Sequence, residues 1–109
     1  MIDVADFQRV DLRVGRILEA EDFPRARKPS YRLRIDFGDL GMRTSVAALK
    51  TDYAVEALPG RQVVCVFNLP PRRIAGLVSE VLVLAATEED GTLRLLRPDP
   101  DAGLGTVIT

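Results

Sequence analysis

The sequence predicts an all-β fold with short helices, formed by one domain over residues 1–109. Apolar and polar residues alternate with a period of two in several short segments, as they do in strands with one buried face. Turn-forming residues, chiefly Gly and Pro, separate these segments at short intervals. Residues 62–69 form a nearly unbroken apolar run, which indicates a strand buried on both faces. Many short strands with frequent turns predict a barrel.

The first strand is predicted over residues 10–20, after a short helical turn that Asp3 caps and that ends near Phe7. The alternation changes phase at Gly15, because the next two apolar residues are adjacent in sequence. A glycine at a phase change inside a strand predicts a β-bulge or a sharp coil at that position.

The second strand, residues 31–37, has the most regular pattern in the chain. Its two faces differ in polarity. The apolar face carries Tyr31, Leu33, Ile35 and Phe37, and the charged face carries Arg32, Arg34 and Asp36. Strict alternation predicts that the apolar face points into the barrel. A turn at residues 38–41 then leads into a third strand at residues 42–48.

Residues 49–58 have a different rhythm and predict a short helix, capped by Thr51 or Asp52 and stopped by Pro59 and Gly60. The remaining strands are predicted at residues 62–69, 80–86, 93–96 and 106–108. Six or seven short strands with one small helix between the third and the fourth are the arrangement of the oligonucleotide-binding (OB) fold. We therefore predict an OB-fold five-stranded β-barrel with N- and C-terminal extensions. Periodicity alone leaves an SH3-like barrel as an alternative.

The charge balance does not favour a purely electrostatic binder of nucleic acid, because the formal net charge is −1. The basic residues are nevertheless unusual: all are arginine except Lys28 and Lys50. Arginine suits carboxylates and phosphates, although a GC-rich genome produces the same bias. A single cysteine, an acidic N-terminus without a signal sequence and no apolar stretch of ~20 residues predict a cytoplasmic protein.

The sequence contains few residues that could catalyse a reaction. It has no histidine, the commonest general base and metal ligand. Cys65 lies within the apolar run, where a buried inert thiol is expected. The acidic residues 88–90 lie in a predicted turn, where solvated charges are ordinary. We therefore predict a protein without enzymatic activity, cofactor or metal.

Two basic clusters point instead to binding. One lies in the loop between the first two strands, beside the outward side of the second strand, and the other follows two prolines in a second loop. The residues are Arg25, Arg27, Lys28, Arg32 and Arg34 in the first cluster, and Arg72 and Arg73 in the second. OB folds bind ligands on strands two and three and on the flanking loops, so both clusters are predicted to line one groove. Each cluster taken alone is also typical of a solvated surface.

Two segments resemble the signatures of a known family. Residues 10–17 (VDLRVGRI) resemble the opening strand of the tRNA-binding domain family, and residues 68–80 (NLPPRRIAGLVSE) resemble its second signature. The second segment and residues 23–27 are most similar to the CsaA branch, regarded as export-related chaperones. Free tRNA binders of the family usually carry a histidine where Phe23 stands and a Gly-Met pair at residues 81–82, so both departures favour the CsaA branch.

The resemblance implies a homodimer joined through the N-terminal segment and the C-terminal part. It also implies binding of unfolded or precursor polypeptides without ATP, in partnership with the secretion machinery. A tRNA-binding accessory protein using the same groove is the alternative, and a purely structural dimer is a third possibility. Peptide binding requires an apolar patch with a polar rim. Candidates are Phe23, Ile74 and Leu77 beside the arginines, unless these residues only pack within the barrel or a dimer interface.

Asn68 and Ser79 complete the predicted binding residues. Asn68 precedes two prolines and is expected to tie that turn together through side-chain to backbone hydrogen bonds. Ser79 is expected either to fix a loop or to bind a ligand phosphate. Gly76, between them, is expected to allow a backbone conformation that a side chain would block.

Overall fold

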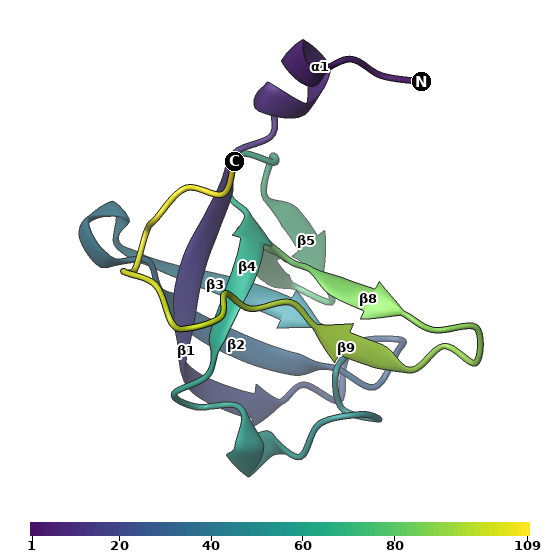
Figure 1. The fold of residues 1–109 in the computed structure, drawn as a ribbon. Coiled ribbons are helices and arrows are strands. Elements are labelled where there is room, and N and C mark those ends of the chain that lie inside the picture. Colours follow the sequence, from purple (N-terminus) through teal and green to yellow (C-terminus); the bar gives the residue numbers. More distant parts are fainter.

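The computed structural model describes residues 1–109 and contains a five-stranded antiparallel barrel with two small hairpins (Figure 1). The barrel strands are hydrogen-bonded in the order β3-β2-β1-β4-β7. The elements are α1 (Val4–Gln8), β1 (Leu12–Asp22), β2 (Tyr31–Asp36), the 3-10 turn η1 (Gly38–Leu40), β3 (Met42–Ala47), the 3-10 turn η2 (Val55–Ala57), β4 (Gln62–Val66), β5 (Arg72–Ile74), β6 (Leu77–Ser79), β7 (Leu82–Val83), β8 (Ala85–Thr87) and β9 (Leu93–Leu95). The predicted OB-like barrel is confirmed.

The core follows the alternation of β2. Leu33, Ile35 and Phe37 are fully buried, and Tyr31 is nearly so. They pack against Ile17 of β1 and inward residues of β4, within one cluster of ten buried residues. All five residues of β4 are buried, as its unbroken apolar run predicts. Burial of this apolar surface is the main source of stability for a domain of this size.

The bulge in β1 lies at Leu18 and not at Gly15, so the predicted position was wrong. The register against β2 shifts between Ile17 and Glu19, and Leu18 is left 40% exposed. Gly15 has another role, because a Cβ there would lie 2.6 Å from the side chain of Ile35. The glycine therefore permits close packing, while the extra residue that bends the strand comes three positions later.

Residues 49–58 do not form the predicted helix beyond the single turn η2. The Asp52 carboxylate caps no helix; it accepts a hydrogen bond from the Leu93 N–H at 3.0 Å. Tyr53 is also engaged, since its hydroxyl accepts from the Leu95 N–H at 2.9 Å and its carbonyl accepts from the Tyr31 hydroxyl at 2.7 Å. The segment is therefore held between the barrel and the β8–β9 hairpin by long-range contacts that override local helix preference.

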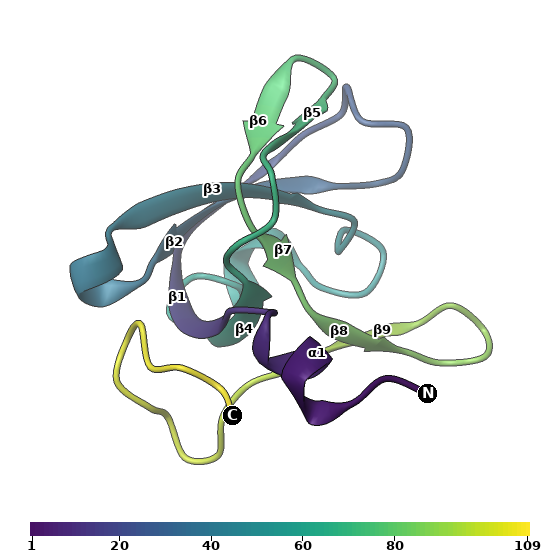
Figure 2. The same ribbon diagram turned by 90° about the horizontal axis from the view of Figure 1, so that it is seen from above.

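Two strand assignments are corrected after β4. Arg72 and Arg73, predicted in a loop, lie on β5, which pairs with β6 to form a hairpin. Its two-residue turn has positive φ at both Ala75 (49°) and Gly76 (89°), the conformation that a tight hairpin turn requires. The predicted strand at residues 80–86 is divided into β7, which belongs to the barrel, and β8, which pairs with β9 (Figure 2).

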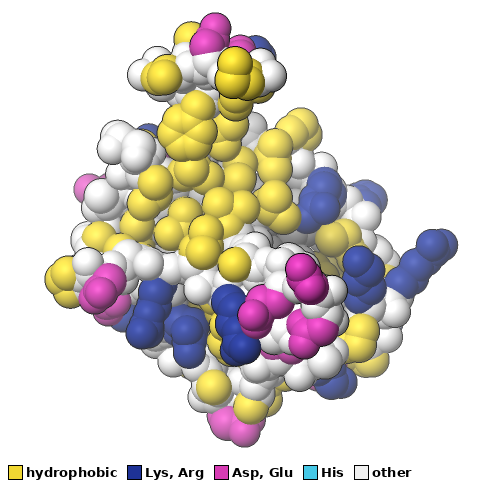
Figure 3. Space-filling view, turned by 45° about the vertical axis from the view of Figure 1, so that its right-hand side comes forward, with side chains coloured by type: hydrophobic (Ala, Val, Ile, Leu, Met, Phe, Trp, Pro, Cys, Tyr) yellow, Lys and Arg dark blue, Asp and Glu magenta, His cyan; other side chains and the backbone are white.

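The N-terminal helix stands outside the barrel and buries none of its residues (Figures 1 and 2). Asp3 caps it as predicted, in a reciprocal capping box with Asp6. Asn68 secures the following segment, since its side chain accepts from the Asp11 N–H and donates to the Arg9 carbonyl. Figure 3 shows apolar side chains continuing from α1 onto the adjacent face of the barrel. No helix is both long and apolar enough to cross a lipid bilayer.

The C-terminal segment folds back over β1 and β4. Only one bridge, between Arg13 and Val107, represents the strand predicted at residues 106–108. The segment is held by the buried side chain of Gln62, which donates to the Ala102 carbonyl at 2.6 Å and accepts from the Ala102 N–H at 2.9 Å. A buried amide with both of its ends paired in this way fixes the path of the chain.

The seam that closes the barrel joins β3 to residues 79–81 mainly through side chains. The Ser79 hydroxyl accepts from the Val46 N–H at 3.1 Å, and the Ser45 hydroxyl donates to the Val81 carbonyl at 2.8 Å. The Glu80 N–H donates to the Thr44 carbonyl, and the Glu80 carboxylate accepts from the Thr44 N–H. Ser79 is only 2% exposed, so its hydroxyl cannot reach a ligand phosphate. Of the two roles expected for Ser79, the hydroxyl therefore has the structural one, and it closes the barrel.

Replacing Ser79 with alanine is expected to lower the free energy of unfolding by about 1–3 kcal/mol, because the buried Val46 N–H loses its partner. Denaturant unfolding of the purified variant measures this loss. Thr87→Ala, at an exposed position whose side chain makes no hydrogen bond, is the control and should stay within about 0.5 kcal/mol of the wild type. Equal stability of the two variants would contradict the role of the seam.

Candidate ligand-binding site

The largest cavity, with a volume of about 770 Å³, opens where the seam stops. Beyond Val46, no hydrogen bond joins β3 to β7 or β8, and the two edges separate. The hairpin β5–β6 and the loop of residues 23–30 stand at its rim. The apolar lining includes Val46, Leu49, Ile74, Leu82, Val83 and Leu93. The volume is typical of ligand-binding clefts.

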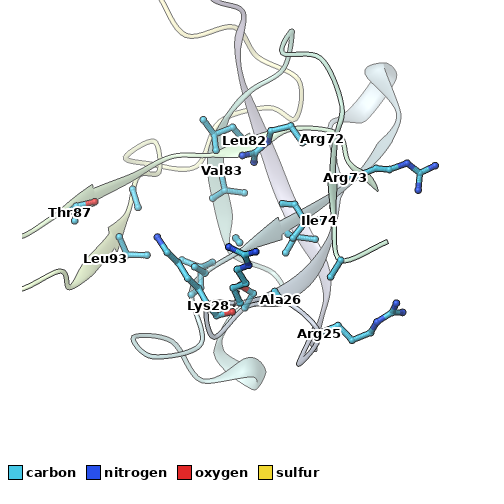
Figure 4. A pocket seen from close by; sticks show the side chains of 18 residues that line it. Arg25, Ala26, Lys28, Arg72, Arg73, Ile74, Leu82, Val83, Thr87 and Leu93 are labelled. Carbon is cyan, nitrogen blue, oxygen red and sulfur yellow. Dashed lines mark hydrogen bonds between the residues drawn. The ribbon is translucent and has the colours of Figure 1, made fainter. Parts of the chain in front are cut away.

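Five basic side chains surround this apolar floor, and they are the loop residues Arg25, Arg27 and Lys28 together with Arg72 and Arg73 of β5. None of them forms an ion pair with a carboxylate, whereas six basic residues elsewhere in the chain do. Figure 4 shows that Lys28 and Arg72 extend over the cavity, while Arg25 and Arg73 direct their guanidinium groups outward. The predicted convergence of the two loop clusters is thus present, and we call these five residues the cationic rim.

The loop that supplies three of the rim residues is anchored at its base. The Phe23 N–H donates to the Ser30 carbonyl at 3.0 Å, and the Ser30 hydroxyl donates to the Lys28 carbonyl at 2.8 Å. Lys50 adds an ion pair with Asp22 at 2.8 Å, which is partly exposed and contributes little by itself. The guanidinium of Arg25 lies next to Gly76, so the tip of the loop meets the turn of the β5–β6 hairpin.

Arg32 and Arg34 do not line the cavity, which corrects the expectation that the outward face of β2 would share the groove. They point across the bulged part of β1, where Arg32 pairs with Glu21 at 2.9 Å and Arg34 lies 4.0 Å from Glu19. Because these acids occupy neighbouring positions on the adjacent strand, the two arginines are balanced locally.

The predicted apolar binding residues do not all lie at the main cavity. Ile74 lines the main cavity, whereas Leu77, its cross-strand partner on β6, does not. Phe23 is half-buried and lines a second cavity of about 500 Å³ beside the loop. Asn68 secures residues 9–11, so its side chain ties the N-terminal segment and not the proline turn.

Sequence reasoning missed the far wall of the cavity, formed by Leu82, Val83, Ala85, Thr87 and Leu93. No local signal marks this wall, because residues 81–86 are continuously apolar and the change from one sheet to another at Leu84 depends on distant partners. Leu84 donates to the Val64 carbonyl and accepts from the Leu96 N–H, so it joins β4 to the β8–β9 hairpin.

The two groups with clearly shifted pKa values, Cys65 and Asp90, do not line the main cavity. Burial raises the pKa of the Cys65 thiol from its ordinary 9.0 to about 12, which keeps the thiol protonated and unreactive at neutral pH. In the acidic turn, the Thr92 N–H donates to Asp90 and lowers the pKa of its carboxyl, so this acid serves the turn. No three His, Cys, Asp or Glu side chains lie close enough together to hold a metal ion.

The fold and the site thus define a class: a small OB-like barrel with an apolar cavity and a cationic rim. The chain belongs to the tRNA-binding domain family, since the model of that family, described as a putative tRNA binding domain, matches residues 12–107. This confirms the family predicted from residues 10–17 and 68–80.

Two solved structures of similar chains cover the protein completely. The chaperone CsaA of Bacillus anthracis strain Ames is 47% identical, with a TM-score of 0.95, over 100% of this chain and 99% of its own. The CsaA chaperone protein of Picrophilus torridus is 43% identical, with a TM-score of 0.93, over 100% of both chains. The similarity to the CsaA branch is therefore confirmed.

A second group of relatives consists of much longer proteins. The methionine–tRNA ligase of Porphyromonas gingivalis is 44% identical over 103 residues, which are 94% of this chain and 15% of the ligase. The chain thus spans about one seventh of the length of this curated relative.

The raised pKa of Cys65 predicts a loss of stability in alkali. Below pH 9 the thiol is protonated in the folded and unfolded states alike; between pH 9 and 12 only the unfolded chain releases the proton. The free energy of unfolding should therefore fall by about 1.4 kcal/mol per pH unit in this window. Urea unfolding against pH measures the slope, and Cys65→Ala should lack this contribution. Identical slopes in the two proteins would contradict the assignment.

Proposed function

We propose that this protein is an export-related chaperone that binds unfolded or precursor polypeptides without ATP and without enzymatic activity. The observation that carries the proposal is the apolar cavity of about 770 Å³ surrounded by five unpaired cations. An unfolded segment offers apolar side chains for the floor and polar or charged groups for the rim. Full-length similarity to two proteins described as CsaA chaperones supports the same function.

The partners in this proposal are precursor or unfolded polypeptides, the secretion machinery and a second copy of the chain. We place the function in the cytoplasm, where the single buried cysteine remains reduced. The sequence has no glycine-rich phosphate loop of the kind that binds ATP, which agrees with a chaperone that holds its client and does not use nucleotide hydrolysis.

The alternative is a tRNA-binding accessory protein that uses the same cavity and rim. The observation in its favour is the set of arginines, which suit phosphates as well as carboxylates, together with the similarity to methionine–tRNA ligases. Against it, aromatic platforms for base stacking are scarce. The cavity lining contains no aromatic side chain, and Tyr31 and Tyr53 are engaged within the fold.

The homodimer is supported by an apolar surface that the single chain leaves uncovered. Val4 and Phe7 of α1 are 70% and 41% exposed, and Val10 is 41% exposed. A helix of five residues is not stable by itself in water. Beside it, Leu82, Leu84 and Ile108 cover the buried outer residues of β1 and β4 and are themselves only partly buried. A second copy packed against α1 and this face would bury both.

The two candidate ligands are distinguished by salt. Fluorescence anisotropy of the protein with labelled bulk tRNA and with a labelled unfolded precursor peptide, each over a salt series, is the test. We expect peptide binding that changes little with salt or strengthens with salting-out ions. Tight tRNA binding with a log–log slope of about −0.7 to −0.9 per phosphate, and no peptide signal, would establish the alternative.

Variants of the site sharpen this test. If peptide is the ligand, Ile74→Ser should weaken binding by roughly tenfold and by more than Arg72→Ala with Arg73→Ala. If tRNA is the ligand, the arginine pair should lower affinity and reduce the salt slope by about 1 for each phosphate that is no longer neutralised. Arg32→Ala with Arg34→Ala removes the same charge away from the cavity and should leave binding unchanged. An effect of the control equal to that of the rim pair would refute the site.

The dimer is tested by Phe7→Asp, which places a charge on the exposed face of α1. We expect the wild type to sediment as a dimer and the variant as a monomer, because an unpaired charge is costly in an apolar interface. Leu18→Asp is the matched control, since Leu18 is 40% exposed on the β1 bulge, and it should remain dimeric. A wild-type monomer at micromolar concentration would disprove the assembly.

A further inference from the structure

The β8–β9 hairpin has two edges, and its hydrogen bonds fix which residues face outward. Glu88 donates to the Thr92 carbonyl at 2.9 Å, and Leu96 donates to the Leu84 carbonyl at 3.3 Å. Antiparallel pairs alternate between hydrogen-bonded and non-hydrogen-bonded. The pairs Ala85–Leu95 and Thr87–Leu93 are therefore non-hydrogen-bonded, and the backbone N–H and C=O groups of their four residues point away from the partner strand.

The outer edge of β9 is capped. Its two outward N–H groups, of Leu93 and Leu95, donate to the carboxylate of Asp52 and to the hydroxyl of Tyr53. Exposed strand edges recruit other strands, so proteins commonly protect them. Here Asp52 and Tyr53 protect the edge, and both belong to residues 49–58, where a helix was predicted.

The outer edge of β8 is open. The backbone N–H groups of Ala85 and Thr87 make no hydrogen bond with any group of the chain, and both residues line the main cavity. Across the cavity lies the end of β3, where the seam has stopped. The strand β8 therefore borders this cavity with outward backbone groups that have no partner in the chain.

The surroundings of this edge specify the chemistry of an occupant. Ile74, Leu82 and Val83 give an apolar floor, which suits the alternate apolar side chains of an extended segment. The cationic rim has no carboxylate partners within the chain, so it is complementary to acidic groups of a ligand.

We infer that a client polypeptide binds as an added β-strand along the open edge of β8, with alternate apolar side chains in the cavity and flanking acidic residues at the cationic rim. The inference rests on the proposed polypeptide-binding function and specifies how that function is performed. Main-chain hydrogen bonds to an edge strand give affinity without requiring a particular sequence, and side-chain pockets add selectivity. Such recognition suits a protein that must accept many unfolded clients.

The first test scans backbone N-methylation along a short labelled peptide with alternating valine and threonine and glutamate at both ends. In an added strand, only every second N–H donates to the edge. N-methylation at those positions should weaken binding by roughly tenfold, and at the intervening positions it should have little effect. The wild-type protein is used throughout, so folding defects play no part. A uniform effect, or none at any position, would overturn the inference.

The second test changes the edge itself. Thr87→Pro removes the outward N–H but no hydrogen bond to β9, whereas Thr87→Ala shortens the side chain and keeps the N–H. We expect the proline variant to bind the peptide roughly tenfold more weakly than the alanine variant, because both lack the threonine side chain and only the alanine variant keeps the N–H. Amide spectra establish that both variants are folded. In the wild type, bound peptide should slow hydrogen exchange at Ala85 and Thr87 and leave Ala86 unchanged.

The acidic component is tested with a peptide in which glutamine replaces both glutamates. Its binding should be several-fold weaker and less sensitive to salt, because the neutral side chains are no longer attracted to the rim. Equal binding of the two peptides would overturn the assignment of the rim. A complete absence of peptide binding, with tRNA bound instead, would overturn the proposed function and this inference together. Peptide binding without a period of two in the N-methylation scan would overturn the inference alone.

Discussion

The geometry of the molecule depends on a seam that is closed along only part of its length. Strands β3, β2, β1 and β4 pair in that order through backbone ladders, but β3 meets residues 79–81 largely through the side chains of Ser45, Ser79 and Glu80. Side-chain hydrogen bonds act at single points and do not propagate as a ladder does. The barrel is therefore closed at these residues and open beyond Val46, and the main cavity lies at this opening.

The partial closure explains why the cationic rim assembles at this place. The β5–β6 hairpin is carried directly by the chain that forms the seam, since Ser79 ends β6 and also bonds to β3. The loop of residues 23–30 leaves β1 after the bulge, whose extra residue redirects the strand. Two segments far apart in sequence thus reach the rim of one opening, and they meet where the Arg25 guanidinium lies next to Gly76.

The sequence predicted those parts of the fold that depend on local pattern. The alternation of residues 31–37 identified the core face of β2, and Asp3 identified the start of α1. The predictions were wrong where a residue far away in the sequence determines the local structure. Residues 49–58 have helical spacing, but Asp52 bonds to Leu93, 41 positions away. The site residues differ in the same way. The arginines of the loop were identified from composition. Arg32 and Arg34 were placed at the cavity wrongly, because their pairing with acids on β1 depends on the strand register.

The junction between the barrel and the β8–β9 hairpin has an optical consequence. The chain contains two tyrosines and no tryptophan. The hydroxyl of Tyr31 bonds to the backbone of Tyr53, whose own hydroxyl holds β9 and whose ring lies 5.2 Å from the guanidinium of Arg61. All intrinsic tyrosine fluorescence therefore originates at this one junction. The protein carries its own spectroscopic reporter at the attachment of the strand pair that borders the cavity, and no label needs to be introduced to observe it.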